Sequence, residues 1–106
     1  MENPKLTGKQ KTHLRGLGQR LESSLSVGRG GVTKTVQDEL ERLLAIHELV
    51  KVRVLAERDD RPVITEVLAA GTGSEIVGSV GKTVLLYRAA PKLGAKRIRL
   101  PDASHD

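Results

Sequence analysis

The sequence predicts a single small α/β domain in which helices and strands alternate along the chain. Its 106 residues are enough for one modest hydrophobic core and too few for a cofactor domain joined to a substrate domain. Apolar residues recur at helical spacing in some segments and alternate with polar residues in others, which gives the order α-β-α-β-α-β-β. Because parallel neighbouring strands need helical crossovers, this order implies a small mixed sheet with helices packed on it.

The first predicted helix begins at Thr7 and runs to about Leu21. Thr7 can cap it, and the side chain of Gln10, three residues later, can return a hydrogen bond as in a capping box. The side expected in the core comprises Leu14, Leu17 and Leu21. Lys11 and Arg15, four positions apart, share a flank that is therefore expected to face solvent.

Thr33 offers a cap for a second helix. The apolar positions of this helix are Val36, Leu40, Leu43, Leu44 and His47. Since His47 ends this stripe, we expect it to be packed and hydrogen-bonded rather than catalytic. Residues 24–27 form a short extended segment before the helix, and residues 50–54, in which valines alternate with basic residues, predict a strand with one buried face.

Asp60 and Pro62 mark a third helix as cap and first-turn residue, and Gly71 marks its end. The stripe expected to be buried is Val63, Ile64, Val67 and Leu68. Residues 74–80 and 82–88 are two further strand candidates, divided by a glycine and rich in valine, isoleucine and leucine.

Residues 89–106 form a basic tail. Within it, residues 96–100 alternate like an edge strand, and the rest is expected to be mobile. The domain is therefore expected to span residues 1–100, with residues 101–106 as a flexible end.

Basic residues are concentrated at both ends of the chain. Residues 1–36 carry seven basic and two acidic residues, and residues 81–106 carry six and two, so a total charge of +5 leaves −4 for residues 37–80. We expect the two ends to come together as one basic face, with the acidic middle turned away from an anionic partner. The alternative is that the basic residues are simply solvated at both termini.

Composition excludes several classes of protein. The absence of cysteine rules out disulfide frameworks, thiolate nucleophiles and cysteine-based metal sites, and it favours a cytoplasmic location. No apolar run approaches a bilayer span, so we expect no membrane partner. With Tyr87 as the single aromatic residue, recognition through several stacking rings is also ruled out.

The most informative segment is Gly28-Arg29-Gly30-Gly31, which lies between a predicted strand and a predicted helix. Backbone amides and a helix N-terminus can point outward there, glycine lets a phosphate approach closely, and Arg29 and Lys34 supply positive charge. The segment is thus a candidate phosphate-binding loop. The alternative is an ordinary tight turn that needs a positive φ.

The same segment, read as GRGGVTKT, comes within one residue of the nucleotide-binding P-loop. Thr33 stands where that motif has its second glycine, and no strand ending in a metal-binding aspartate follows. The chain is also short for a doubly wound nucleotide-binding sheet. A nucleoside triphosphatase is therefore disfavoured.

No catalytic or metal-binding constellation stands out in the sequence. His13, His47 and His105 are far apart and have no partner at a metal-ligand spacing. Serine and threonine residues lack a recognisable nucleophile setting. We therefore expect no enzymatic activity, no cofactor, no metal and no small-molecule substrate.

Three segments together resemble a known family. They are LTGKQKTHLRGLGQRL near the start, VGRGGVTKTVQDELERLLAIHELVKVRV in the middle and VGKTVLLYR near the end. In this order and spacing they are similar to the YhbY-like CRM domain, the chloroplast RNA splicing and ribosome maturation domain. The resemblance covers roughly residues 6–100. The turn around residues 57–62 and the tail beyond Pro101 fall outside the shared pattern.

The resemblance implies a four-stranded mixed sheet with three helices, similar to the C-terminal domain of translation initiation factor 3. It also implies RNA binding and, for stand-alone bacterial members, association with ribosomal RNA in precursors of the large ribosomal subunit. The G-x-x-G loop of the family falls on Gly28, Arg29, Gly30 and Gly31. The candidate RNA-binding residues are these four with Lys34, Lys9, Lys11, Arg15, Lys82 and Arg88.

Two other functions stay open at the level of sequence. One is a protein-interaction module that docks on a ribosomal protein or tethers a partner through an exposed sheet edge. The other, disfavoured above, is a P-loop-like nucleotide-binding protein. The oligomeric state does not follow from the sequence.

Overall fold

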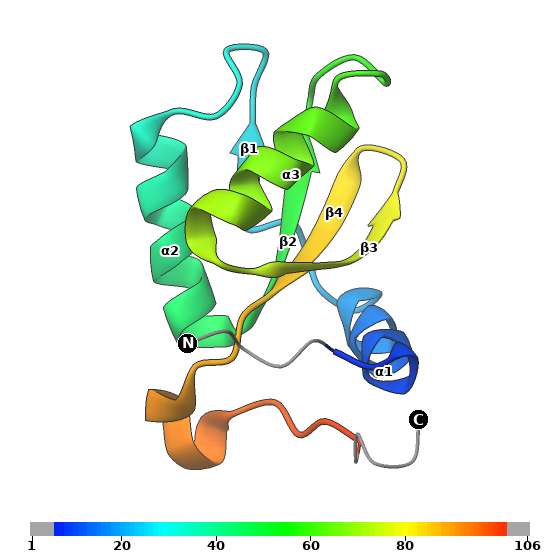
Figure 1. The fold of residues 1–106 in the computed structure, drawn as a ribbon, viewed down its shortest axis with the longest axis vertical. Coiled ribbons are helices and arrows are strands. Elements are labelled where there is room, and N and C mark those ends of the chain that lie inside the picture. Colours follow the sequence, from blue (N-terminus) through cyan, green and yellow to red (C-terminus); the bar gives the residue numbers. More distant parts are fainter. Residues whose placement is uncertain (1–5, 102–106) are drawn as a thin grey trace.

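The computed structural model describes residues 6–101, and within them the helices and strands follow the predicted order (Figure 1). The elements are α1 (Gly8–Gly18), β1 (Leu25–Val27), α2 (Lys34–His47), β2 (Leu49–Val54), α3 (Arg61–Thr72), β3 (Glu75–Val80), β4 (Thr83–Tyr87) and a 3-10 helix, η1 (Pro91–Lys96). None of the helices in this part of the chain is long and apolar enough to cross a membrane.

The four strands form one mixed sheet in the order β1-β2-β4-β3. β1 pairs with β2 in parallel, and α2 supplies the crossover between them. β4 is antiparallel to both β2 and β3. The prediction of a small mixed α/β sheet is therefore confirmed.

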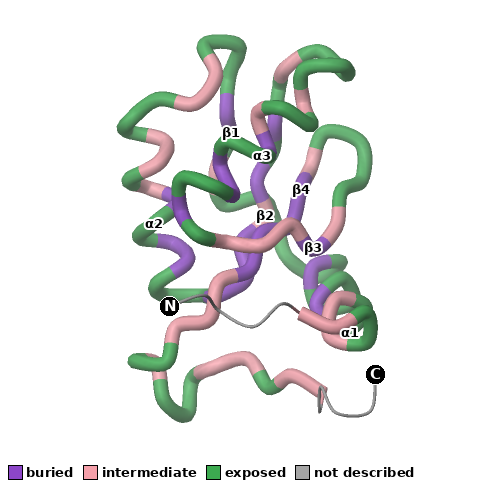
Figure 2. The backbone as a smooth tube through the Cα atoms, in the orientation of Figure 1, coloured by how far each residue is buried: buried purple, intermediate pink, exposed green. Residues whose placement is uncertain are grey.

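Helices pack on both faces of the sheet, so there are two apolar clusters (Figure 2). The larger cluster lies between the sheet and helices α2 and α3, and Leu40, Val52 and Leu86 are fully buried in it. The smaller cluster lies under α1, where Leu14 is fully buried against Leu85 and its neighbours. Alternate residues of β2 thus face different clusters, as the period of a strand requires.

The threonine caps predicted from sequence are present. The Thr7 hydroxyl accepts a hydrogen bond from the Gln10 amide at 3.1 Å, and the Gln10 side chain accepts one from the Thr7 amide at 3.0 Å. The Thr33 hydroxyl accepts one from the Val36 amide at 3.2 Å. Asp60 precedes α3 as predicted, but its side chain makes no capping hydrogen bond.

α1 ends at Gly18, earlier than the predicted end near Leu21. Leu14 is buried as predicted, but Leu17 and Leu21 are exposed by 36% and 39%. Gly18 lets the end of α1 lie close against the sheet, because a Cβ at this position would overlap the side chain of Leu85. The helix therefore reaches the sheet through Leu14 and Gly18, and the prediction that Leu17 and Leu21 belong to the core is wrong.

Two further predictions about helix faces are wrong. Val63 and Val67 of α3 are exposed by 64% and 46%, since α3 packs through Leu68 and Ala69. α3 also continues past Gly71 to Thr72 and ends where Gly73 takes a left-handed conformation, with a φ of 65°. His47 is exposed, because the chain turns out of α2 immediately after it.

The C-terminal segment is not the predicted edge strand. Residues 91–96 form η1, and the following residues do not join the sheet. Ile98 and Leu100 instead pack against the cluster under α1. Residues 102–106 lie outside the described part of the chain, so the predicted flexible end stays a prediction.

Candidate nucleic-acid interface

Residues 28–31 connect β1 to α2 and project beyond the end of the sheet (Figure 1). The Gly31 amide donates to the Gly28 carbonyl at 3.0 Å, which closes a turn. Gly31 has a φ of 78°, a conformation that favours glycine, whereas a Cβ on Gly28 or Gly30 would meet only open space. One glycine is thus needed for the turn, and the other two leave the backbone open to a ligand.

The backbone amides at the tip of this loop are available for binding. Within residues 6–101, the amides of Arg29 and Gly30 donate no hydrogen bond. The Arg29 side chain is exposed and forms no ion pair with any described residue. An anion at this tip would therefore meet two free N–H groups and an unneutralised guanidinium group.

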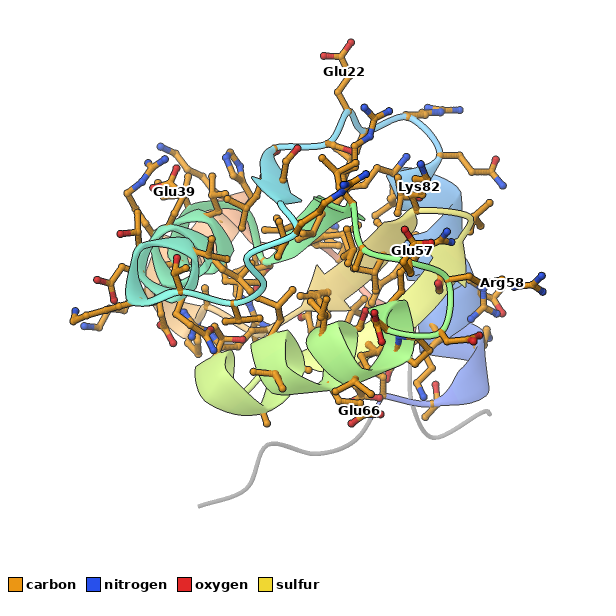
Figure 3. The ribbon with its side chains drawn as sticks, turned by 90° about the horizontal axis from the view of Figure 1, so that it is seen from above. Glu22, Glu39, Glu57, Arg58, Glu66 and Lys82 are labelled. Carbon is orange, nitrogen blue, oxygen red and sulfur yellow. The ribbon has the colours of Figure 1, made fainter. Side chains whose placement is uncertain are left out.

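Two other connections lie at the same end of the sheet. The Leu55 amide donates to the Val27 carbonyl at 2.9 Å, and the Val54 amide donates to the Lys82 carbonyl at 2.7 Å. The ends of β1 and β2 and the turn between β3 and β4 are therefore adjacent. We call this region, comprising residues 28–31, 53 and 81–82, the loop end; Figure 3 views the molecule from it.

Arg53 and Lys82 add positive charge to the loop end. Arg53 is exposed on β2, and its backbone pairs with Ser26 on one side and Thr83 on the other. Lys82 is exposed in the turn before β4. Neither forms an ion pair within the described residues, so their charges are available to an external anion.

Lys34 lies at the first position of α2, beside the loop. Its ammonium group donates to the Asp38 carboxylate at 2.9 Å. This hydrogen bond, together with the charge of Asp38, raises the pKa of Lys34. The Lys34 ammonium group is therefore already paired with an acid on its own helix, whereas the Arg29 guanidinium group forms no ion pair with a described residue.

The basic residues of α1 lie away from the loop end. Lys11 pairs with Glu75 at 3.3 Å, and Arg15 donates to the Val77 carbonyl at 3.0 Å. Lys11 is therefore half-buried rather than fully exposed, and both side chains help to hold α1 on β3. Lys9 is exposed on the same helix.

Arg88 lies at the opposite end of β4 from Lys82. Its guanidinium group donates to the Glu41 carboxylate at 2.7 Å and to the Thr72 carbonyl at 2.8 Å. Its side chain is only 20% exposed. Arg88 thus joins α2 to the end of α3.

The expectation of one basic face is not met by this arrangement. The two ends of the described chain do meet, since the Gln10 side chain donates to the Pro101 carbonyl at 3.0 Å. The glycine loop, however, lies at the other end of the sheet (Figure 1). Nor is the acidic middle turned away, because Glu41, Glu48 and Glu75 pair with basic residues from the two ends.

The structure adds Arg53 to the residues singled out from the sequence. Its alternation with valines already indicated an outward-facing side chain. Its proximity to the glycine loop and to Lys82 depends on the pairing of β2 with both β1 and β4, which a single sequence does not reveal.

Within residues 6–101 no group of three or more histidine, aspartate or glutamate side chains could hold a metal ion. His13 and His47 are exposed, and His105 lies outside the described residues. What the loop end offers chemically is a set of free amides and cations for an anionic ligand.

The described residues thus form a small mixed α/β domain with an open glycine loop and, beside it, cations that form no ion pair among those residues. The CRS1 / YhbY (CRM) domain model matches residues 6–88, and the chain belongs to this family. The matched region includes the glycine loop and Lys82.

Relatives and a solved structure agree with this assignment. The chain is 46% identical over 88 residues to a Pseudomonas aeruginosa protein named "Probable RNA-binding protein PA4753", covering 82% of this chain and 85% of the relative. It is 36% identical over 97 residues to the Bacillus subtilis "Probable RNA-binding protein YqeI", covering 91% and 99%. The solution structure of the Staphylococcus aureus protein SAV1595 superposes with a TM-score of 0.78 at 34% identity, covering 92% and 100%.

Proposed function

We propose that this protein binds folded RNA through the loop end and acts as an assembly factor on ribosomal RNA in precursors of the large ribosomal subunit. The observation that carries the proposal is that Arg29, Arg53 and Lys82 all lie at the same end of the sheet as a loop with free backbone amides. All three are exposed and form no ion pair within the described residues. The relatives named as RNA-binding proteins support the RNA-binding part of the proposal.

The mode of binding follows from the side chains present. Tyr87, the only aromatic residue, is 5% exposed, so base stacking on aromatic rings contributes nothing. Affinity then comes from phosphate contacts and from the shape of the RNA, which suits a folded RNA better than a defined single-stranded sequence. The protein binds transiently and biases RNA folding, a role that requires no cofactor.

The candidate residues fall into groups according to their position relative to the loop end and the intramolecular contacts that their side chains make. Gly28, Arg29, Gly30 and Gly31 carry the contact, and Lys82 and Arg53 extend it. Lys34 and Lys9 contribute charge at longer range. Lys11, Arg15 and Arg88 contribute less, because moving them to an RNA phosphate would break the intramolecular contacts they make.

Crosslinking of the protein to RNA in cells, with the adducts mapped, tests the ribosomal part of the proposal. We expect adducts concentrated in large-subunit ribosomal RNA precursors, fewer adducts with Arg29→Ala, and an undiminished number with the matched variant Arg99→Ala, because Arg99 is exposed in the C-terminal segment. Adducts spread over messenger and transfer RNA would contradict the ribosomal role. Crosslinks to a ribosomal protein alone would favour the protein-docking alternative.

A further inference from the structure

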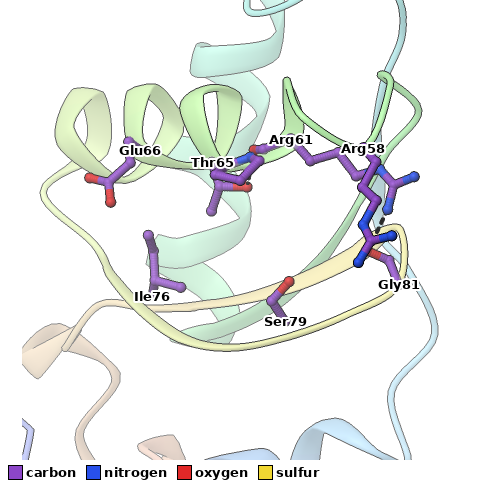
Figure 4. Close-up of a pocket in the computed structure, with 8 residues that line it drawn as sticks. Arg58, Arg61, Thr65, Glu66, Ile76, Ser79 and Gly81 are labelled. Carbon is purple, nitrogen blue, oxygen red and sulfur yellow. Dashed lines mark hydrogen bonds between the residues drawn. The ribbon is translucent and has the colours of Figure 1, made fainter.

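A groove of about 640 Å³ lies between α3 and β3 (Figure 4). Ligand pockets in proteins span roughly 300–1,000 Å³, so the groove has room for one small organic group. Its lining includes Arg58, Arg61, Thr65, Ile76, Ser79 and Gly81. The groove meets the loop end at Gly81, which precedes Lys82 in the turn between β3 and β4.

One end of the groove carries two arginine side chains, of which one is held by hydrogen bonds. Arg61 donates from Nε to the Ala56 carbonyl at 3.1 Å and from Nη1 to the Gly81 carbonyl at 3.1 Å. Arg58 is exposed and reaches the same end of the groove (Figure 4). Although the neighbouring turn contains acidic residues, neither arginine forms an ion pair in the described part of the chain.

The rest of the groove differs from this end. Ile76 gives an apolar wall, and the Ser79 hydroxyl makes no hydrogen bond within residues 6–101. Glu66 is exposed at the far end of the groove. A carboxylate there repels a second phosphate, so the groove suits one nucleotide rather than a continuing RNA backbone.

We propose that this groove receives one unpaired nucleotide of the bound RNA, with its phosphate at Arg58 and its base between Ile76 and Ser79. The inference rests on the proposed RNA binding, because continuity through Gly81 and Lys82 is what places RNA at the mouth of the groove. It adds a preference for RNA in which a folded region is flanked by a single-stranded nucleotide.

The test compares two RNAs, a blunt hairpin and the same hairpin with a short unpaired overhang. The wild-type protein is expected to bind the overhang RNA about tenfold more tightly, as for a gained charge-assisted phosphate contact with a partly enclosed base. Arg58→Ala removes the cation, and Ser79→Phe fills the groove at an exposed position. Each should bring the ratio of the two affinities close to one, whereas Arg99→Ala should keep the wild-type ratio.

The results separate the two proposals. Suppose that the wild-type protein binds both RNAs with equal affinity and that binding still depends on Arg29. This result would overturn the proposed nucleotide site in the groove, but not the proposed RNA binding through the loop end. The nucleotide site would also be overturned if the ratio of the two RNA affinities stayed at the wild-type value in both Arg58→Ala and Ser79→Phe. Absence of salt-dependent binding to either RNA would overturn the proposed function together with the groove.

Discussion

Glu48 and Arg97, which lie 49 positions apart in the sequence, form an ion pair in which Arg97 Nε donates to the Glu48 carboxylate at 2.9 Å. The same carboxylate accepts hydrogen bonds from the amides of Ala90 and Ile98, both at 2.7 Å. The Glu48 side chain is fully buried, and its φ of 62° makes it the one described non-glycine residue with a positive φ. Glu48 therefore fixes the C-terminal segment to the end of α2.

Replacing Glu48 by glutamine should release that segment. The glutamine side chain has one acceptor oxygen in place of two, and its NH2 group would face the N–H donors that now bind the carboxylate. We therefore expect a loss of about 2 kcal/mol in the free energy of unfolding. Urea unfolding measures the loss, and faster hydrogen exchange at the Ala90 and Ile98 amides locates it. Glu39→Gln is the control, because the Glu39–Arg42 pair is exposed and such pairs are worth about 0–1 kcal/mol. Equal effects of the two substitutions would contradict the assigned role of Glu48.

Tyr87 should titrate later in the folded protein than in the unfolded chain. Burial raises the pKa of its hydroxyl, and the negative charge of Glu48 raises it further, while Arg97 acts in the opposite direction. The unfolded chain therefore loses this proton first, at a pH near 10, and the stability due to the neutral hydroxyl is complete below that pH and lost above it.

Because Tyr87 is the only aromatic residue, the absorbance of its phenolate reports this group alone. The titration is measured once in buffer and once in denaturant. Tyr87→Phe should remove this contribution to the loss of stability above pH 10. Identical titrations in the two solvents would refute the account of this site.

The loop glycines should separate folding from binding. Gly30→Asp should leave the melting temperature nearly unchanged, since a Cβ there meets open space, but it should weaken RNA binding by about tenfold because a carboxylate repels phosphate. Gly30→Ala should change neither property greatly. Gly31→Ala should instead cost about 1 kcal/mol in stability, because the φ of 78° disfavours alanine. Normal RNA affinity in a well-folded Gly30→Asp protein would show that the loop is structural.

Lys34 should not support nucleotide hydrolysis. Thr33 caps α2 with its side chain, and Lys34 pairs with Asp38, so neither residue is arranged as in a P-loop. We expect no turnover of ATP or GTP, with or without magnesium. Stoichiometric nucleotide binding that disappears in Lys34→Ala would contradict this expectation.

The features predicted correctly from sequence depend on residues close together in the chain. Thr7 and Thr33 cap helices through residues three positions on, and the mixed sheet follows from the alternation of helices and strands along the chain. The glycine loop was found in the same way, because its open backbone follows from its composition.

The features that were missed depend on contacts between distant segments. Which leucines and valines of α1 and α3 are buried is decided by the sheet they pack on, as the contact of Gly18 with Leu85 shows. The hydrogen bonds of Glu48 reach residues 42 to 50 positions away. Likewise, Arg53 and Lys82 come together only through the register of β2 and β4.

The most direct test of the central claim is the salt dependence of binding to a folded ribosomal RNA fragment. If the loop end and its surroundings neutralise about five phosphates, the logarithm of the association constant should fall with the logarithm of salt concentration at a slope of about −4. Arg29→Ala should lower affinity by roughly tenfold and reduce the magnitude of the slope by about one, while Arg99→Ala should change neither. An association constant that is independent of salt, or Arg29→Ala and Arg99→Ala proteins that bind equally well, would contradict RNA binding through the loop end.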